Sequence, residues 1–294
     1  MKRIVYTLLL LAFFTTRINT GSFARTCLQK VICFFHLGAL EKIDHKELST
    51  DSLTAISIKN CNGSITIKTG WKKNHLCLKI IRRAKKQSDL DAIKIIADST
   101  NSHHLAISTY CTQKKMKGSV EYELIVPTSL GVMLSTNKGD ICINDIQGKI
   151  KAATKKGSIC IENAQGEVEA LSEYGAITII NAHSSVTARS IKGKVVVNYA
   201  ALPHDSNVQL STISGNIALT VPALINATVH CSTAYATVCS DHYITLSPYV
   251  TQLNYCAWAK FKKEVNGTIG SGKATISLTS TYGNINIFRD SSVA

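Results

Sequence analysis

Four glutamates are the residues of this chain whose type and spacing come closest to a catalytic set. A polysaccharide-cleaving enzyme needs paired carboxylates on one face, one as acid and one as base. Here the glutamates occupy outward, polar positions and are interleaved with Lys151, Lys155 and Lys156, a pattern in which charges are usually solvated. The sequence therefore predicts a protein that is not an enzyme, with a glycan-active β-helix enzyme as the alternative. The glutamates are Glu162, Glu167, Glu169 and Glu173.

Metal-binding patterns do not accompany these carboxylates. The nine histidines are scattered, and no two cysteines have the Cys-x-x-Cys spacing of a zinc or redox site. A calcium-binding β-roll needs an aspartate at each turn, and only one of four equivalent positions supplies it. We therefore expect neither a metal site nor a cofactor. The four positions are Asp140, Ser158, Ala176 and Lys194.

Basic residues are in excess and gather in short clusters. The chain has 33 lysines and arginines against 19 acidic residues, a formal charge of +14. Such an excess attracts anionic polymers or membrane surfaces, and a tryptophan beside lysines could stack on a sugar ring. The alternative is a set of solvated lysines and a tryptophan that covers the edge of a core. The predicted ligand-binding residues are Trp71, Lys72, Lys73, Arg82, Arg83, Lys85 and Lys86.

A strand–turn–strand template occurs seven times and supplies the framework for these side chains. Four copies follow one another at a period of eighteen residues, and apolar and polar residues alternate within each half. Alternation is typical of strands with one buried face, and a fixed short period indicates that each copy adds one rung to a stack. The turn glycines of the seven copies are Gly63, Gly139, Gly157, Gly175, Gly193, Gly215 and Gly283.

Two corners per copy follow from this template. The glycine column at 139, 157, 175 and 193 predicts a corner that needs positive φ, and a hydroxyl residue three positions earlier is expected to hydrogen-bond that corner. A second corner carries Gly148 and Gly166, with Ser184 in the next copy. The sequence thus predicts an all-β, single-domain parallel β-solenoid, or β-helix, with two-strand coils of about 18 residues.

The start of the chain has the pattern of a secretory signal. Lys2 and Arg3 precede an apolar stretch over 4–14, and Ser22-Phe23-Ala24 fits a cleavage site. Cleavage there removes three basic residues and lowers the charge from +14 to +11. We therefore predict a signal peptide at 1–24 and a protein exported to the periplasm or cell surface, where nucleic acid is not an expected partner. The rest divides into a leader segment at 25–50, the β-solenoid at 51–290 and a tail at 291–294.

Ten cysteines follow the predicted cleavage site, and export would place them where disulfides can form. Cys142 and Cys160 hold equivalent outward positions on adjacent rungs, where side chains point the same way, so they are expected to stay unpaired. Cys231 and Cys239 are spaced for a local bridge, as are Cys27 and Cys33.

Several segments resemble a bacterial family labelled "putative adhesin", a β-strand-repeat domain of unknown function. The run 62–71 resembles its opening strand pair, and 122–127 resembles its entry into the repeat. The runs 266–272 and 282–287 resemble its end, and the match spans about 51–290. The resemblance implies a β-solenoid of the bacterial cell envelope and no catalytic residues.

Taken together, the sequence predicts a non-enzymatic envelope protein that binds or scaffolds through a basic surface. Its expected partner is an anionic envelope polymer or a membrane surface. A protein–protein scaffold is the other alternative, because the ends of a solenoid expose strand edges that can pair. The sequence does not fix an oligomeric state.

Overall fold

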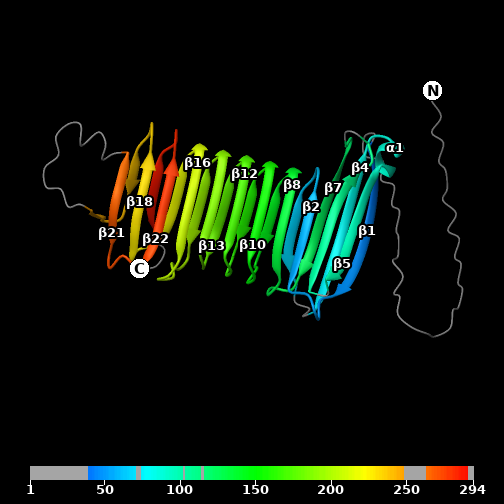
Figure 1. Ribbon diagram of the computed structural model, residues 1–294, viewed down its shortest axis with the longest axis horizontal. Coiled ribbons are helices and arrows are strands. Elements are labelled where there is room, and N and C mark those ends of the chain that lie inside the picture. The colour runs from blue at the N-terminus through cyan, green and yellow to red at the C-terminus, as the bar shows by residue number, and fades with distance from the viewer. Residues whose placement is uncertain (1–38, 71–73, 102, 114–115, 248–262, 291–294) are drawn as a thin grey trace, which may run out of the picture.

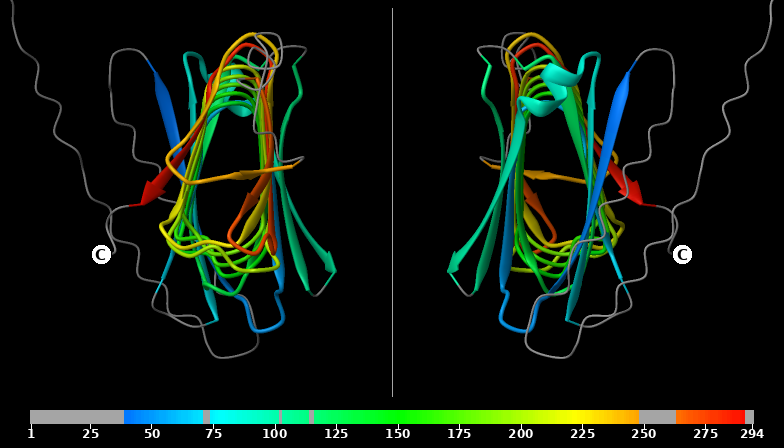
Figure 2. Two further views of the ribbon diagram at one scale, coloured as in Figure 1. Left: turned by 90° about the vertical axis from the view of Figure 1, so that its left-hand side faces the viewer. Right: turned by 90° about the vertical axis from the view of Figure 1, so that its right-hand side faces the viewer.

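The computed structural model describes residues 39–70, 74–101, 103–113, 116–247 and 263–290, which form an elongated stack of strands (Figure 1). Within these residues, a 12-stranded and an 11-stranded sheet enclose the core between them. Seen along the stack, the central rungs superpose as nested, flattened loops (Figure 2). The predicted β-solenoid is confirmed.

The first strands of the seven copies lie side by side in the 12-stranded sheet, parallel and in register. Equivalent positions pair directly, because Ile150 lies opposite Val132 on one side and Val168 on the other. In spatial order these strands are β2 (Ala55–Asn60), β8 (Gly131–Lys138), β10 (Ile150–Lys156), β12 (Val168–Tyr174), β14 (Val186–Lys192), β16 (Asn207–Ser214) and β22 (Ala274–Ser280).

The second strands of the same copies run in the 11-stranded sheet. Their inward residues form an unbroken apolar column, in which Ile159, Ile177 and Val195 are in register and almost wholly buried. In spatial order these strands are β3 (Ile65–Thr69), β9 (Ile141–Asn144), β11 (Ile159–Glu162), β13 (Ile177–Ala182), β15 (Val195–Tyr199), β17 (Ile217–Pro222) and β23 (Ile285–Asp290).

The long insertion after the first copy closes one end of the stack. Its strands lie next to β2 and β3, and the outer pairs are antiparallel, which ends the parallel series. The segment 40–49, placed in the predicted leader, forms an edge strand on this cap. The elements of this N-terminal cap are β1 (Leu40–Ser49), which precedes the first copy, and, from the insertion, β4 (His75–Ala84), α1 (Gln87–Asp91), β5 (Ile93–Asn101), β6 (His104–Cys111) and β7 (Gly118–Val126).

The insertion before the last copy closes the other end in the same way. One of its strands pairs parallel with β22, and the next pairs antiparallel with that strand. Because the last copy returns to lie beside the sixth, both insertions lie outside the seven-rung stack. The elements are β18 (Ala227–Thr233), β19 (Val238–Ser240), β20 (Thr245–Leu246) and β21 (Glu264–Ile269).

The glycine column forms a continuous spine, but for a different reason from the one predicted. Positive φ occurs at Gly139 (138°) and Gly157 (152°), and the prediction is wrong for Gly175 and Gly193, whose φ lies outside the left-handed region. Space is the common requirement. A Cβ on Gly175 would lie 1.9 Å from the carbonyl oxygen of Gly157, and one on Gly193 would lie 2.0 Å from that of Gly175.

The predicted hydroxyl column also forms a ladder beside the glycine spine. Each buried hydroxyl donates to the glycine carbonyl of the preceding rung: Thr154 to Gly139 at 3.0 Å, and Ser190 to Gly175 at 3.0 Å. The same bond recurs at every rung from Thr136 to Thr233. These bonds satisfy carbonyls that the close stacking shields from water.

At the second corner, positive φ occurs at asparagine and aspartate residues. Asp145, Asn163 and Asn181 have φ of 61°, 56° and 56°, a region in which their short polar side chains are tolerated. Each amide also bonds the rung before it: the Nδ2 of Asn163 lies 2.7 Å from the Oδ1 of Asp145, and the Nδ2 of Asn181 lies 2.9 Å from the Oδ1 of Asn163. Gly148 and Gly166 are needed for close approach to the preceding rung.

Candidate functional site

The two arginines of the predicted basic site at the N-terminal cap are paired with carboxylates. Arg82 lies on the inward face of β4, where its Nη2 is 2.5 Å from the Oδ2 of Asp44 and both side chains are mostly buried. Its Nη1 also donates to the carbonyl of Ile93 at 3.4 Å. Arg82 therefore closes the end of the core.

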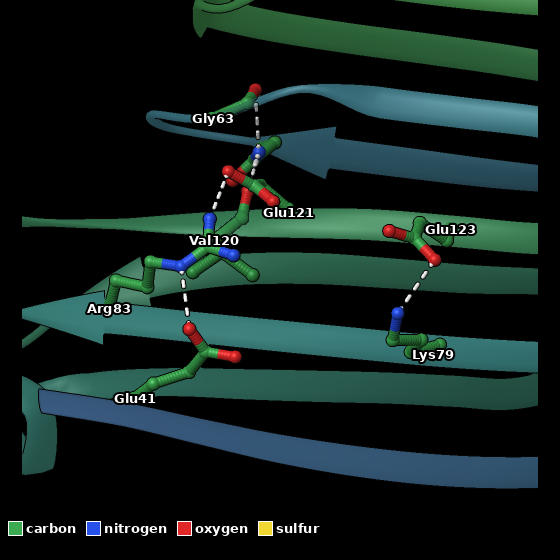
Figure 3. Close-up of polar contacts among 8 residues, drawn as sticks. Glu41, Gly63, Lys79, Arg83, Val120, Glu121 and Glu123 are labelled. Atoms are coloured by element: carbon green, nitrogen blue, oxygen red, sulfur yellow. Dashed lines mark hydrogen bonds and ion pairs between the residues drawn. The ribbon is translucent and has the colours of Figure 1, made fainter. Parts of the chain in front are cut away.

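Arg83 lies on the other face of the cap and is held by two carboxylates. Figure 3 shows it between Glu41 of β1 and Glu121 of β7. Its Nε is 2.9 Å from the Oε2 of Glu41, and this hydrogen bond, with the charge of Glu121, raises the pKa of the guanidinium. The Lys79–Glu123 pair in the same view is another such contact, at 2.9 Å.

Of the remaining five residues of that predicted site, the structure describes two. Lys85 and Lys86 are exposed on the turn that enters α1. Trp71, Lys72 and Lys73 lie outside the described residues. The ligand-binding role of the seven residues stays a prediction.

A second basic feature runs along the first corner of the stack. Lys138, Lys156, Tyr174 and Lys192 each end a strand of the 12-stranded sheet, and successive members pair in register. Ser214 and Tyr282 continue the line, and Tyr235 follows on the next rung. We call this line the corner ridge: Lys138, Lys156, Tyr174, Lys192, Ser214, Tyr282 and Tyr235.

The charges of the corner ridge are not neutralised by carboxylates. All three lysines are exposed, and within the described residues none of them forms an ion pair. Lys156 and Lys192 lie on Tyr174, with Nζ 5.9 Å and 5.5 Å from the ring centroid. Adjacent rungs are about 4.8 Å apart, so Lys138 and Lys156 lie within the Debye length of about 8 Å at physiological salt and reinforce one potential, whereas Lys192 lies two rungs beyond Lys156. Like charges in adjacent in-register positions repel, and an anion along the ridge would relieve that repulsion.

The C-terminal end of the corner ridge is aromatic. Tyr235 and Tyr282 stack with ring centroids 5.0 Å apart and an interplanar angle of 6°. Their exposed fractions of 71% and 60% are large for side chains of this size. Exposed, mutually stacked rings form a rigid apolar surface beside the cationic part of the ridge.

A groove of about 550 Å³ runs beside the corner ridge on the outer face of the 12-stranded sheet. The small side chains of Ser135 and Ala153 leave the depression, and Leu171 contributes an exposed apolar wall. Its lining carries three positive charges, from Lys59, Lys155 and Arg189, and one negative charge, from Glu173. A second depression, of about 430 Å³, shares some of these residues and extends the groove across the sheet.

The four glutamates do not assemble into a catalytic pair. Glu162 ends β11 in the 11-stranded sheet, whereas the other three lie on or beside β12 in the opposite sheet. Glu167 pairs with Lys149 and Glu169 pairs with Lys151, each at 2.6 Å. These carboxylates therefore balance lysines of the preceding rung.

The cysteines of the described residues are all free thiols. The suggested Cys231–Cys239 bridge is wrong, because Cys231 points into the core while Cys239 is exposed on the opposite sheet. Burial raises the pKa of Cys231 to about 12, which makes it an unreactive core residue. Cys142 and Cys160 are unpaired, as predicted. Cys27 and Cys33 lie outside the described residues.

Metal-ligand groups and membrane-spanning helices are both missing from the part of the chain that the structure describes. No three or more His, Cys, Asp or Glu side chains gather there. None of its helices has the length and apolar character needed to cross a bilayer.

The two parallel sheets, facing each other across one core, define a β-solenoid. The chain belongs to the Toastrack DUF4097 family, whose model matches residues 47–288. The resemblance to the "putative adhesin" family of unknown function is thereby confirmed. No curated protein matches the chain in sequence.

Solved structures from three bacterial genera are similar to this chain over most of its length. A "putative cell adhesion protein" from Clostridium sporogenes is 12% identical, covers 85% of this chain and 100% of its own, and has a TM-score of 0.38. A "putative adhesin" from Bacteroides fragilis is 12% identical, with coverages of 84% and 97% and a TM-score of 0.37. A "putative lipid binding protein" from Parabacteroides distasonis is 11% identical, with coverages of 83% and 96% and a TM-score of 0.36.

Proposed function

We propose that this protein is a non-enzymatic envelope module that binds an anionic polysaccharide along the corner ridge and its groove. The observation that carries the proposal is the in-register row of exposed lysines without carboxylate partners. A linear polyanion can follow such a row, because the rungs repeat along a straight axis at about 4.8 Å.

The aromatic residues favour a sugar polymer over other polyanions. Tyr235 and Tyr282 provide a flat exposed surface on the same line as the lysines, suited to the apolar face of a sugar ring. The groove beside the ridge offers room for side groups of the polymer. A flat membrane surface would contact only the outermost side chains of the corner ridge and would not enter the groove.

The test is binding to dextran sulfate, with neutral dextran as the reference, across a salt titration. Replacing Lys138, Lys156 and Lys192 together by glutamine should weaken binding to dextran sulfate at least ten-fold. The slope of log affinity against log salt should fall by about two to three units, because three counterion-releasing contacts are lost. The Tm should stay close to that of the parent, since all three side chains are exposed.

A matched control removes the same charge from the N-terminal cap. Lys85, Lys86 and Lys94 are also exposed, and their replacement by glutamine should leave affinity within about two-fold of the parent. If the cap variant loses affinity for dextran sulfate and the ridge variant keeps it, the binding site lies on the N-terminal cap. Equal binding to anionic lipid vesicles and to dextran sulfate would count against a polysaccharide.

An envelope ligand requires that the protein is exported. The prediction of export depends on the sequence pattern of the first 24 residues. We expect the protein recovered from the cell envelope fraction to begin at Arg25, because the small residues Ser22 and Ala24 fit the cleavage site. Amino-terminal sequencing measures this directly. A protein that retains Met1 and stays in the cytosolic fraction would exclude an envelope ligand.

A further inference from the structure

Cys142 and Cys160 form a pair of free, partly exposed thiols on the outer face of the 11-stranded sheet. They lie directly opposite each other on β9 and β11, between Ile141–Ile159 and Ile143–Ile161, which fix the register from both sides. Neither thiol has a role in the core or in the polysaccharide-binding surface proposed above. Eighteen residues separate them in sequence, which hides the pair from any search for local cysteine motifs.

The register opposes a disulfide between these two residues. Side chains in equivalent positions of neighbouring parallel strands leave the sheet in the same direction, about 4.8 Å apart. A disulfide needs sulfurs about 2.05 Å apart and Cβ–S bonds turned by about 90° about the S–S axis. Parallel bonds on a rigid sheet meet neither condition.

The same geometry suits one metal ion placed between the two sulfurs. A metal–thiolate bond is about 2.3 Å long, so two thiolates on opposite sides of one ion lie about 4.6 Å apart. That span is close to the strand separation, and the side chains need not lean toward each other. Because both Cα–Cβ bonds leave the sheet in the same direction, an ion between the two sulfurs lies along the stack axis.

The donor set selects among metal ions. Zinc in proteins takes four ligands. Among the described residues, the in-register neighbours of the pair are Thr66 and Thr178, and the Oε1 of Glu162 lies 3.9 Å from the Sγ of Cys160, a set without further thiolate or imidazole ligands. Soft thiolates favour Cu(I), which is satisfied by two of them in a line. The carboxylate of Glu162 beside Cys160 adds negative charge that attracts a cation.

We propose that Cys142 and Cys160 bind one Cu(I) ion in linear, two-coordinate geometry across adjacent rungs of the solenoid. Binding exchanges two protons for the ion: each thiol releases its proton to solvent as its sulfur bonds the metal, and no electron is transferred. The site is independent of the corner ridge, which lies on the strand ends of the other sheet.

The experiment is an anaerobic titration of the reduced, purified chain with Cu(I), followed by alkylation with iodoacetamide and peptide mapping by mass spectrometry. One equivalent of Cu(I) should protect Cys142 and Cys160 together, at least ten-fold relative to the metal-free protein. In competition with a coloured Cu(I) chelator, Cys142→Ser and Cys160→Ser should each bind one equivalent less than the parent. Cys239→Ser is the matched control, since it removes an exposed thiol of the same sheet and should keep that equivalent.

Alkylation of the thiols and binding of Cu(I) report separately on the pair. Protection of Cys160 that persists in Cys142→Ser would mean that the two sulfurs do not share an ion. Absence of protection at both residues would exclude the site, and so would a disulfide-linked peptide containing both cysteines. Because serine is close in size to cysteine and both positions are partly exposed, the variants are expected to fold, which an unchanged Tm would verify.

Discussion

Replacing Gly175 by alanine should destabilise the protein by about 3–5 kcal/mol, a large effect for a single methyl group. The added Cβ would lie 1.9 Å from the carbonyl oxygen of Gly157 and 2.5 Å from its carbonyl carbon. Backbone occupies that space, so no side chain can turn away to make room. The two rungs would have to separate locally by about 1 Å to reach an ordinary contact.

Separation at this corner would also break the hydrogen bonds that surround it. The N–H of Gly157 donates to the carbonyl of Tyr174 at 3.1 Å, and the hydroxyl of Ser172 donates to the carbonyl of Gly157 at 3.1 Å. These groups are shielded from water, so a lost bond leaves them unsatisfied at about 1–3 kcal/mol each. Thermal unfolding should therefore show a Tm lowered by about 10 °C.

Gly131 provides the matched control for this prediction. A Cβ there would meet its nearest neighbour, the carbonyl oxygen of Thr54, at 3.5 Å, an ordinary contact. Gly131→Ala should therefore melt within about 2 °C of the parent. Equal Tm values for the two variants would show that rungs can spread at the corner and that the glycine spine is not a steric requirement.

The sequence was sufficient to predict the stack, because its signal is repeated and local. Seven copies with the same spacing place Val132, Ile150 and Val168 at equivalent points, and the sheet pairs them as equivalents. The inward hydroxyl column follows from the same repetition. The steric requirement for glycine at the corner was not predictable in this way. Positive φ is a property of a single residue, whereas the close approach of Gly175 to Gly157 is a contact between two rungs.

The candidate site was harder to predict, because its charges depend on partners that are distant in sequence. Arg82 and Arg83 form a basic run with Lys85 and Lys86, yet carboxylates at positions 41, 44 and 121 neutralise the two arginines. The corner ridge did leave a signal. A turn glycine directly follows each of the three lysines, Lys138, Lys156 and Lys192. Aligning the copies of the repeat therefore places the lysines at one equivalent position, whereas a search for consecutive basic residues does not find them.

Placing aspartate at Ile177 should cost about 4–5 kcal/mol, the largest effect that we expect from a single substitution in the core. Ile177 is fully buried and lies in register between Ile159 and Val195, so the carboxyl would meet apolar neighbours on both rungs. The change removes the transfer free energy of a large side chain, and it leaves a polar group without hydrogen-bond partners.

Thr178→Asp is the matched control, because Thr178 is the next residue on β13 and faces outward. It introduces the same charge on the same strand, and its Tm should fall by no more than about 2–3 °C. Ile177→Thr gives a graded second variant that should fold with an intermediate loss if Ile177→Asp does not. Similar melting of the aspartate variants at 177 and 178 would mean that the inward face of β13 is wrongly assigned.

The pH dependence of Ile177→Asp separates burial of a charge from simple loss of packing. Burial disfavours the ionised carboxyl, so its pKa in the folded protein would be raised above the unfolded value of about 3.9. A raised folded pKa means that the folded state binds the proton more tightly. The relative stability of the variant is therefore best at pH values below the unfolded pKa, and it falls as pH rises through the folded pKa. The Tm deficit against Ile177→Thr should accordingly shrink on acidification, whereas a deficit independent of pH would show that the carboxylate reaches solvent.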